Sequence, residues 1–248
     1  QIEHIHLRPD MYVGSLKPKK YTNEWVSNSK CTKITKTNSI KYSDGLVRIF
    51  IEAVSNAIDN VWRSKETPTP CKNIKICIDK ETGMTSVWND GLCIPIEKNS
   101  KTQLYNPELI FGHLLTSSNY DDTQDRYTSG RNGLGIKLTN VFSRVFTIDV
   151  SDGKKKYMRT WSNNMRDCGD ENIKSCSKKG YTSVSWIPDF EKFKMTGYDT
   201  NTIKLYHKIV LDTAMITKVN VYLNGEKINI KSLTDYAKLF CGENKNFI

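Results

Sequence analysis

The residues from 48 to 63 restrict most strongly how this chain can fold. This stretch contains neither Pro nor Gly, and its apolar residues recur every three or four positions: Phe50, Ala53, Val54, Ala57, Ile58 and Val61. That spacing predicts an amphipathic helix with one buried face. We expect the helix to begin near Ser43 or Asp44, because either side chain can serve as its N-cap.

The polar face of this helix has an unusual composition. Glu52, Asn56 and Asn60 are four residues apart and form one ridge, with Ser55 and Asp59 beside it. A solvated face is one interpretation, but such faces are normally built from Lys, Glu, Gln and Arg, whereas Asn and Ser weaken a helix. No basic residue lies between positions 48 and 63. A single carboxylate among short amides also suits a site, with a base to activate water and neutral oxygens to hold a hard metal ion.

Composition limits the class of protein. With 248 residues, the chain can bury a full core as one large domain or two small ones. It contains no membrane-length apolar run and no signal peptide, and its start at Gln1 suggests a fragment. Seven scattered Cys without a CxxC pair indicate reduced thiols in an intracellular protein. The net charge of +10 permits a polyanionic partner, although the Lys-rich segments 17–20 and 154–156 are typical of solvated loops.

Two further segments combine turn chemistry with candidate ligands. Residues 74–78 and 85–88 are predicted to form a hairpin that runs into Asn89-Asp90-Gly91. This triplet is either a simple turn or a place where Asn89 or Asp90 bonds a ligand edge and Gly91 allows close approach. The second segment, residues 130–137, has three glycines before an expected helix and can cradle a phosphate. Its sequence matches neither a Walker loop nor a dinucleotide fingerprint.

The remaining elements follow from local patterns. Residues 1–16 are expected to form an ordered arm, residues 17–44 a surface excursion with short strands, and residues 107–120 a short apolar helix. Strands are expected at 145–150, 156–161, 182–187 and 219–223, with a helix at 205–215 and a hairpin turn at Asn224-Gly225. The four His residues are dispersed, which argues against a metal or triad role.

The order of these motifs resembles the nucleotide site of the GHKL ATPases, which include gyrase, large heat-shock chaperones, MutL and sensor histidine kinases. The runs at 8–14, 110–122 and 222–225 are similar to the ATPase domain of eukaryotic-type DNA topoisomerase II. The resemblance covers nearly the whole chain. It implies the GHKL or Bergerat ATPase fold, an α/β (α+β) two-layer sandwich with a mixed β-sheet and helices on one face, as a single domain over residues 1–248.

The resemblance also implies ATP and Mg²⁺ as cofactors. Glu52 would activate the attacking water, Lys137 would add positive charge at the phosphates, and Asn56 would coordinate Mg²⁺. Asn89 would bond the adenine edge, where gyrase-like members carry Asp. The other implied nucleotide-binding positions are Asn60, Phe111, Ser117, Ser118, Asn119, Gly130, Arg131, Asn132, Gly133, Leu134, Gly135, Ile136 and Thr182. Cys93 stands where the family usually has a second Gly, so we expect its side chain to fit against the base or to shift the backbone.

Activity and partners are likewise implied by the resemblance. The chain would be the ATP-hydrolysing N-terminal gate of a type II topoisomerase, without the transducer and DNA-cleavage domains. It would act on double-stranded DNA through the full-length enzyme, form a homodimer on binding ATP, and hydrolyse ATP weakly or not at all when isolated. We expect residence in the nucleus, or at the site of genome replication in a virus. The alternatives are an ATPase of the chaperone or mismatch-repair type and a nucleotide-binding dimerisation module without hydrolysis.

Overall fold

The computed structural model describes residues 1–114 and 134–241. Its central feature, among these residues, is a nine-stranded sheet in the order β10-β8-β7-β11-β6-β5-β12-β13, with β9 paired to β8. All pairs are antiparallel except β5 with β12. The strands are β5 (Asn73–Ile78), β6 (Thr85–Asp90), β7 (Ser143–Ser151), β8 (Lys155–Ser162), β9 (Asp167–Cys168), β10 (Asn172–Ser175), β11 (Tyr181–Pro188), β12 (Asn220–Leu223) and β13 (Glu226–Lys227).

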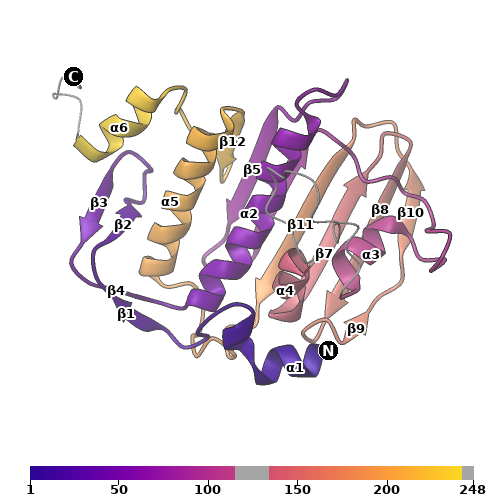
Figure 1. Ribbon diagram of the computed structural model, residues 1–248, viewed down its shortest axis with the longest axis horizontal. Coiled ribbons are helices and arrows are strands. Elements are labelled where there is room, and N and C mark those ends of the chain that lie inside the picture. The colour runs from indigo at the N-terminus through magenta and orange to yellow at the C-terminus, as the bar shows by residue number, and fades with distance from the viewer. Residues whose placement is uncertain (115–133, 242–248) are drawn as a thin grey trace, which may run out of the picture.

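Helices cover one face of this sheet, as Figure 1 shows for α2 (Asp44–Ser64), α4 (Gly135–Val141) and α5 (Thr200–Thr217). The central strands bury alternate residues beneath them, for example Phe146, Ile148 and Val150 on β7. Alternation of this kind is expected when one sheet face contacts a core. The predicted two-layer arrangement, a mixed sheet with helices on one face, is therefore confirmed.

Helix α2 crosses the middle of the sheet and begins where the sequence predicted. Its N-cap is Ser43, whose hydroxyl accepts a hydrogen bond from the Leu46 amide at 3.2 Å. The Phe50 ring is fully buried and stacks on Tyr206 of α5, with ring centroids 3.9 Å apart. Tyr206 in turn donates its hydroxyl to the Leu46 carbonyl at 2.7 Å. These contacts fix the orientation of α2 and, with it, the direction of its polar face.

The peripheral elements include two small sheets, β1 (Lys19–Tyr21) with β4 (Ile40–Tyr42) and β2 (Glu24–Ser27) with β3 (Ile34–Thr37). They confirm the predicted excursion with short strands. The N-terminal arm contains the short helix α1 (Ile2–Leu7) and a 3₁₀ turn, η1 (Pro9–Met11). The predicted Asn224-Gly225 turn joins β12 to β13 with positive φ at both residues. None of the described helices has the length and apolar character that crossing a membrane requires.

Two expectations about helices were wrong. The predicted helix over residues 107–120 is the shorter α3 (Asn106–Gly112), because His113 already has extended backbone angles. At Gly112 the helix lies so close to the sheet that an added Cβ would be 2.5 Å from the Trp161 ring. The C-terminal helix α6 (Leu233–Cys241) was not predicted. Its apolar residues Leu233, Tyr236, Ala237 and Phe240 follow helical spacing, and Tyr236, Leu239 and Phe240 pack partly buried against the core, so the sequence did contain a signal for it.

Candidate active site

The Glu52 carboxylate lies between α2 and the beginning of α4. A Cβ added to Gly135, the first residue of α4, would be 2.1 Å from Glu52 Oε2. Only a glycine therefore allows the carboxylate to take this position. A second contact joins the same two helices, because the buried Thr139 hydroxyl donates to the Ile49 carbonyl at 2.8 Å. The acidic group of the helix ridge and the last glycine of the Gly-rich segment are thus neighbours.

Arg48 forms the principal charged contact of Glu52. Its Nη2 lies 2.5 Å from Glu52 Oε1, one helical turn away, and its side chain is 54% exposed whereas that of Glu52 is 15% exposed. Burial raises the pKa of Glu52 above its ordinary value, Arg48 opposes that rise, and Asp59 adds to it by repulsion. The carboxylate is therefore more basic than an exposed Glu, as the acceptor of a proton from water should be.

Lys137 lies two residues beyond Gly135 in α4 and is only 2% exposed. Burial lowers the pKa of Lys137 to about 8, because the ammonium is removed from water. A buried ammonium group is attracted more strongly to an anionic ligand than an exposed Lys is, because less water screens the attraction. The backbone of Lys137 belongs to the helix whose first residue, Gly135, contacts Glu52.

Asn89 and Thr182, both predicted to border an adenine, are direct neighbours in the sheet. They are register partners on the adjacent strands β6 and β11. Asn89 is 6% exposed and donates from Nδ2 to the Asp90 carbonyl at 2.8 Å. Two residues 93 positions apart in the sequence therefore face the same part of the molecule.

Asp90, the alternative ligand in this turn, is occupied by structural bonds. Its Oδ1 accepts the backbone N–H groups of Lys72 and Asn73 at 2.7 and 2.8 Å, and its Oδ2 accepts Asn73 Nδ2 at 2.7 Å. Burial alone would raise the pKa of Asp90, but these hydrogen bonds outweigh burial and the pKa is lowered. Of the two candidates left open by the sequence, Asn89 is the one whose side-chain oxygen accepts no hydrogen bond recorded among the described residues.

Asn60 fastens the same turn to helix α2. Its Nδ2 donates to the Leu92 carbonyl at 2.9 Å, and its Oδ1 accepts the Leu92 amide at 3.0 Å. Between them, Gly91 has φ +109°, and an added Cβ would lie 2.7 Å from Cys71 Cβ. The Asn60 amide is thus used to position the turn, while its predicted contact with nucleotide stays a prediction.

Cys93, which replaces an expected glycine, lies against a glycine on a neighbouring segment. A Cβ added to Gly180 would be 1.6 Å from Cys93 Sγ and 3.2 Å from the Ser151 carbonyl. Gly180 has no positive φ, so it is needed here for space and not for backbone conformation. The thiol therefore occupies volume that another side chain would take at position 180. This is the means by which the chain accommodates Cys93.

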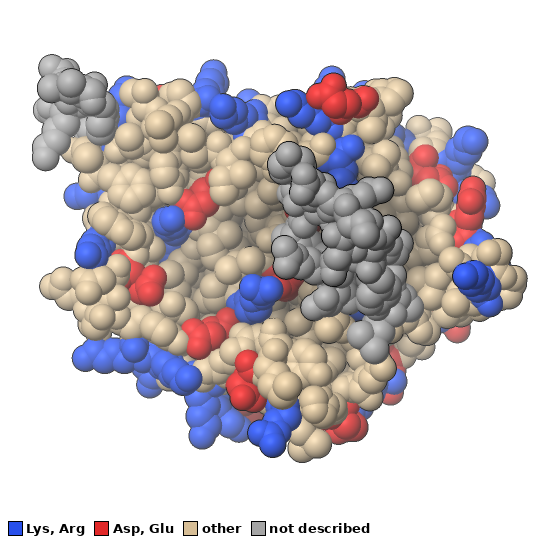
Figure 2. All heavy atoms as spheres, in the orientation of Figure 1, with Lys and Arg blue, Asp and Glu red and all other residues tan. Residues whose placement is uncertain are grey.

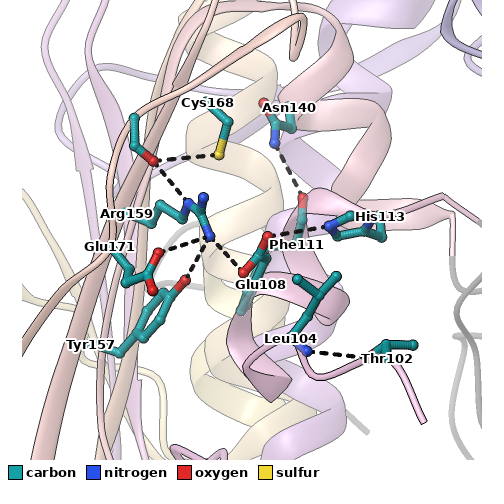
Figure 3. A network of polar contacts seen from close by, with 11 residues as sticks. Thr102, Leu104, Glu108, Phe111, His113, Asn140, Tyr157, Arg159, Cys168 and Glu171 are labelled. Carbon is teal, nitrogen blue, oxygen red and sulfur yellow. Dashed lines mark hydrogen bonds and ion pairs between the residues drawn. The ribbon is translucent and has the colours of Figure 1, made fainter. Parts of the chain in front are cut away.

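Helix α3 is held on the sheet by a buried charge network (Figure 3). Arg159 of β8 places Nη1 2.5 Å from Glu108 Oε2 and 3.5 Å from Glu171 Oε2, and donates from Nε to the Gly169 carbonyl at 2.9 Å. His113 lies 3.3 Å from the other Glu108 oxygen. Each charged group in the network has a partner, and these contacts offset much of the free energy lost when the charges are removed from water. It fixes the end of α3, just before the predicted nucleotide contacts at 117–119.

The other predicted positions are distributed between surface, core and undescribed segments. Asn56 is exposed, which suits a ligand for an added ion. The side chains of Ile136 and Phe111 are in the hydrophobic core, where Phe111 also accepts Asn140 Nδ2 at its carbonyl. Leu134 lines a cavity of about 120 Å³ beside the N-terminal arm. Ser117, Ser118, Asn119, Gly130, Arg131, Asn132 and Gly133 lie outside the described residues.

Sequence reasoning missed three residues that shape this region. Arg48 could have been found, because its separation of four residues from Glu52 is the spacing of a helical ion pair. The sequence contains no comparable local spacing that would identify Arg159 or Gly180. Each acts through a partner distant in the sequence, Glu108 and Cys93 respectively.

Comparison with known proteins places this geometry in context. Residues 41–189 match the family described as histidine kinase-, DNA gyrase B-, and HSP90-like ATPase. DNA topoisomerase 2 of Penicillium chrysogenum is 46% identical over 97% of the chain, and that of Invertebrate iridescent virus 6 is 43% identical over 96%. The chain spans 15% and 22% of the length of these two proteins.

Solved structures agree in fold. The ATPase region of Saccharomyces cerevisiae topoisomerase II bound to ICRF-187 (dexrazoxane) has a TM-score of 0.91 and 38% identity, over 97% of this chain and 63% of that one. The ATPase and transducer domains of Balamuthia mandrillaris DNA topoisomerase II give a TM-score of 0.89 and 34% identity, over 96% and 61%. The resemblance recognised in the sequence is thereby confirmed.

The Arg48–Glu52 pair yields a first prediction. Replacing Arg48 with Met should raise the pKa of Glu52 further, because burial would no longer be opposed by the guanidinium. A raised folded-state pKa means that ionising Glu52 costs stability as the pH rises above 4.5, so the variant should lose more stability over that range. The carboxyl carbon of Glu52, assigned with Glu52→Gln, can be titrated by NMR. Arg63→Met, an exposed change on the same helix, is the control; an unchanged Glu52 titration in Arg48→Met would refute the pairing.

The contact between Cys93 and Gly180 yields a second prediction. Gly180→Ala should lower the free energy of unfolding by about 1–3 kcal/mol, because the new methyl group overlaps the thiol. In a Cys93→Gly background the same change should cost much less, giving a measurable coupling in a double-mutant cycle. Urea unfolding measures both. Gly197→Ala is the control, since nothing lies within 4 Å of an added Cβ there. Additive effects of the two changes would contradict the contact.

Proposed function

Because the chain belongs to the histidine kinase-, DNA gyrase B- and HSP90-like ATPase family, we propose that it binds ATP with Mg²⁺ as the N-terminal gate of a type II DNA topoisomerase. The observation that carries the proposal is the contact between Glu52 and Gly135. It joins the candidate base for water to the segment that the resemblance assigns to the phosphates. The relatives named above are DNA topoisomerase 2 proteins, which favours this function over that of a chaperone or mismatch-repair ATPase.

The described residues fit a magnesium-bound triphosphate in three respects. Lys137 supplies a buried cation, Gly135 leaves room at the start of α4, and Asn56 presents an exposed amide oxygen donor. When bound, Mg²⁺ would neutralise phosphate charge and be held by Asn56. Asn89 and Thr182, paired across β6 and β11, would receive the adenine.

In the reaction, Glu52 accepts a proton from the attacking water while Lys137 attracts the phosphate oxygens. Phosphoryl transfer depends mainly on such positioning and charge neutralisation. Arg48 holds one Glu52 oxygen, which leaves the other, against Gly135, to face the water. Bound nucleotide would favour a closed dimer over the open state, because it binds the closed state more tightly. In the longer protein this closure would trap a DNA duplex, in the nucleus or at a viral replication site.

Calorimetry with a non-hydrolysable ATP analogue, with and without Mg²⁺, tests the proposal directly. We expect saturable binding that strengthens with Mg²⁺. Absence of binding under both conditions would overturn the proposed function.

A third prediction concerns Glu52. In the longer protein, Glu52→Ala and the isosteric Glu52→Gln should lower ATP turnover about 100- to 10,000-fold while leaving analogue binding intact, because a general base acts on water and not on the bound nucleotide. Steady-state hydrolysis and calorimetry separate the two effects. Loss of binding together with turnover would instead make Glu52 a structural residue or metal ligand. Unimpaired turnover would assign water activation to another group.

A fourth prediction follows from Lys137. With its pKa at about 8, the ammonium loses its proton as the pH rises through that value, so affinity for the ATP analogue should fall about tenfold between pH 7 and 9. In Lys137→Arg the charge persists over this range, and any remaining affinity should be nearly independent of pH. Calorimetry at several pH values measures both. An equal decline in both variants would show that Lys137 is not the titrating group.

A further inference from the structure

The positive charge of the chain is concentrated in one segment outside the candidate active site. Residues 11–43 contain seven lysines and one glutamate, so they carry +6 of the chain's formal +10. All seven lysine side chains are exposed: Lys17, Lys19, Lys20, Lys30, Lys33, Lys36 and Lys41. The rest of the chain is close to balanced. A segment this unbalanced differs from an ordinary solvated surface, where both signs are mixed.

The two small sheets turn these lysines outward. Val26 and Ile40 are buried against Leu205 of α5 and anchor the segment. Tyr21 stacks on Tyr42 with centroids 4.4 Å apart and donates its hydroxyl to Asp44. The buried Val26 and Ile40 thus face the core, and the exposed lysines project into solvent. Figure 2 shows the resulting basic surface over β1 and β4, at the lower left.

Within this surface, like charges stand directly opposite each other. Lys20 of β1 and Lys41 of β4 are register partners in the antiparallel pair, with Lys19 next to them. Opposed like charges destabilise a sheet. No ion pair recorded among the described residues joins any of the seven lysines to an acidic group. The cost of this arrangement is relieved when a polyanion supplies the missing negative charge.

The chain's other lysine-rich region is built differently. At the far edge of the large sheet, Lys156 pairs with Asp149 at 2.8 Å. Asp152 accepts the backbone N–H groups of Lys154 and Lys155, and these hydrogen bonds, with a smaller effect from the charge of Lys155, outweigh burial and lower the pKa of Asp152. Residues 149–179 contain eight basic and five acidic residues. In this region the lysines are therefore largely balanced by nearby acidic residues, so it can serve as a control for the lysines of residues 11–43.

We propose that Lys17, Lys19, Lys20 and Lys41, hereafter the lysine edge, bind the phosphate backbone of duplex DNA. The inference rests on the proposed function, which supplies DNA as the polyanion that the longer protein handles. Exposed lysines on a short sheet contact phosphates as point charges and read no base sequence. Binding should therefore be independent of sequence and should weaken steeply with salt, as counterions are released from the DNA.

The test measures binding of a labelled mixed-sequence duplex to this chain by fluorescence anisotropy, between about 0.05 and 0.2 M salt. Replacing the four lysines of the lysine edge with Gln should reduce the slope of log affinity against log salt by about 3 to 4, since each lost phosphate contact removes about 0.9. At about 0.1 M salt, affinity should fall at least tenfold. The matched control changes Lys154, Lys155, Lys174 and Lys179 to Gln, which removes the same charge from the compensated region and should alter the slope little.

Equal losses in both variants would overturn the proposal, because net charge and not a defined surface would then govern binding. An unchanged slope in the lysine-edge variant would overturn it as well. Sedimentation with phosphatidylserine-containing vesicles tests the other polyanionic surface. Vesicle binding that the lysine-edge changes abolish, with DNA binding preserved, would assign the edge to a membrane. Calorimetry with the ATP analogue on the same proteins separates the two proposals, since failed nucleotide binding refutes the proposed function and an unaltered DNA slope refutes only this inference.

Discussion

The burial of one carboxylate between two helices is the constraint on which this structure depends. Glu52 can remain between α2 and α4 only because Gly135 presents no side chain to it and Arg48 supplies a counter-charge. A buried acid without such a partner would be protonated or would destabilise the fold. The stack of Phe50 on Tyr206 holds α2 in the orientation that aims Glu52 at α4. Helix α2 therefore carries both the candidate base, Glu52, and a central core residue, Phe50, two positions away.

The sequence predicted the parts of the fold that depend on local patterns. Helix α2, the β5–β6 hairpin and the strands β7, β8 and β11 follow from periodicity and turn residues, and each is present. Helix α3 ended earlier than predicted because its limit is set by a distant contact, the Trp161 ring beneath Gly112. Helix α6 was not predicted although Leu233, Tyr236, Ala237 and Phe240 follow helical spacing, so its omission does not reflect a lack of local pattern. Local rules describe elements well, but they cannot describe ends that are fixed by another part of the chain.

The same division applies to the site. Glu52 was identifiable because the Asn and Ser residues beside it are poorly suited to a solvated helix, and Asn89 and the glycine segment were identifiable from their turn residues and glycine spacing. Asn60 was identified as polar and functional, yet the structure shows that its amide secures the backbone of Leu92. A sequence can indicate that a polar side chain forms a specific interaction. Whether its partner is a ligand or a neighbouring turn depends on which backbone lies beside it in the fold. Gly180 illustrates the limit, since its importance exists only in relation to Cys93.

Two kinds of electrostatic interaction are separated in different parts of this chain. At the candidate active site, single charges are buried, and burial shifts the pKa values of Glu52 and Lys137 toward neutrality. Such groups respond to one ligand at short range. On residues 11–43 the lysines are exposed and outnumber the single glutamate seven to one, and their summed field extends about a Debye length into solution. Shifted pKa values require buried groups, whereas long-range attraction requires charges that are exposed to solvent. One surface cannot be both buried and exposed, and in this chain the exposed lysines lie on the segment of the two small sheets, away from the contacts that hold Glu52.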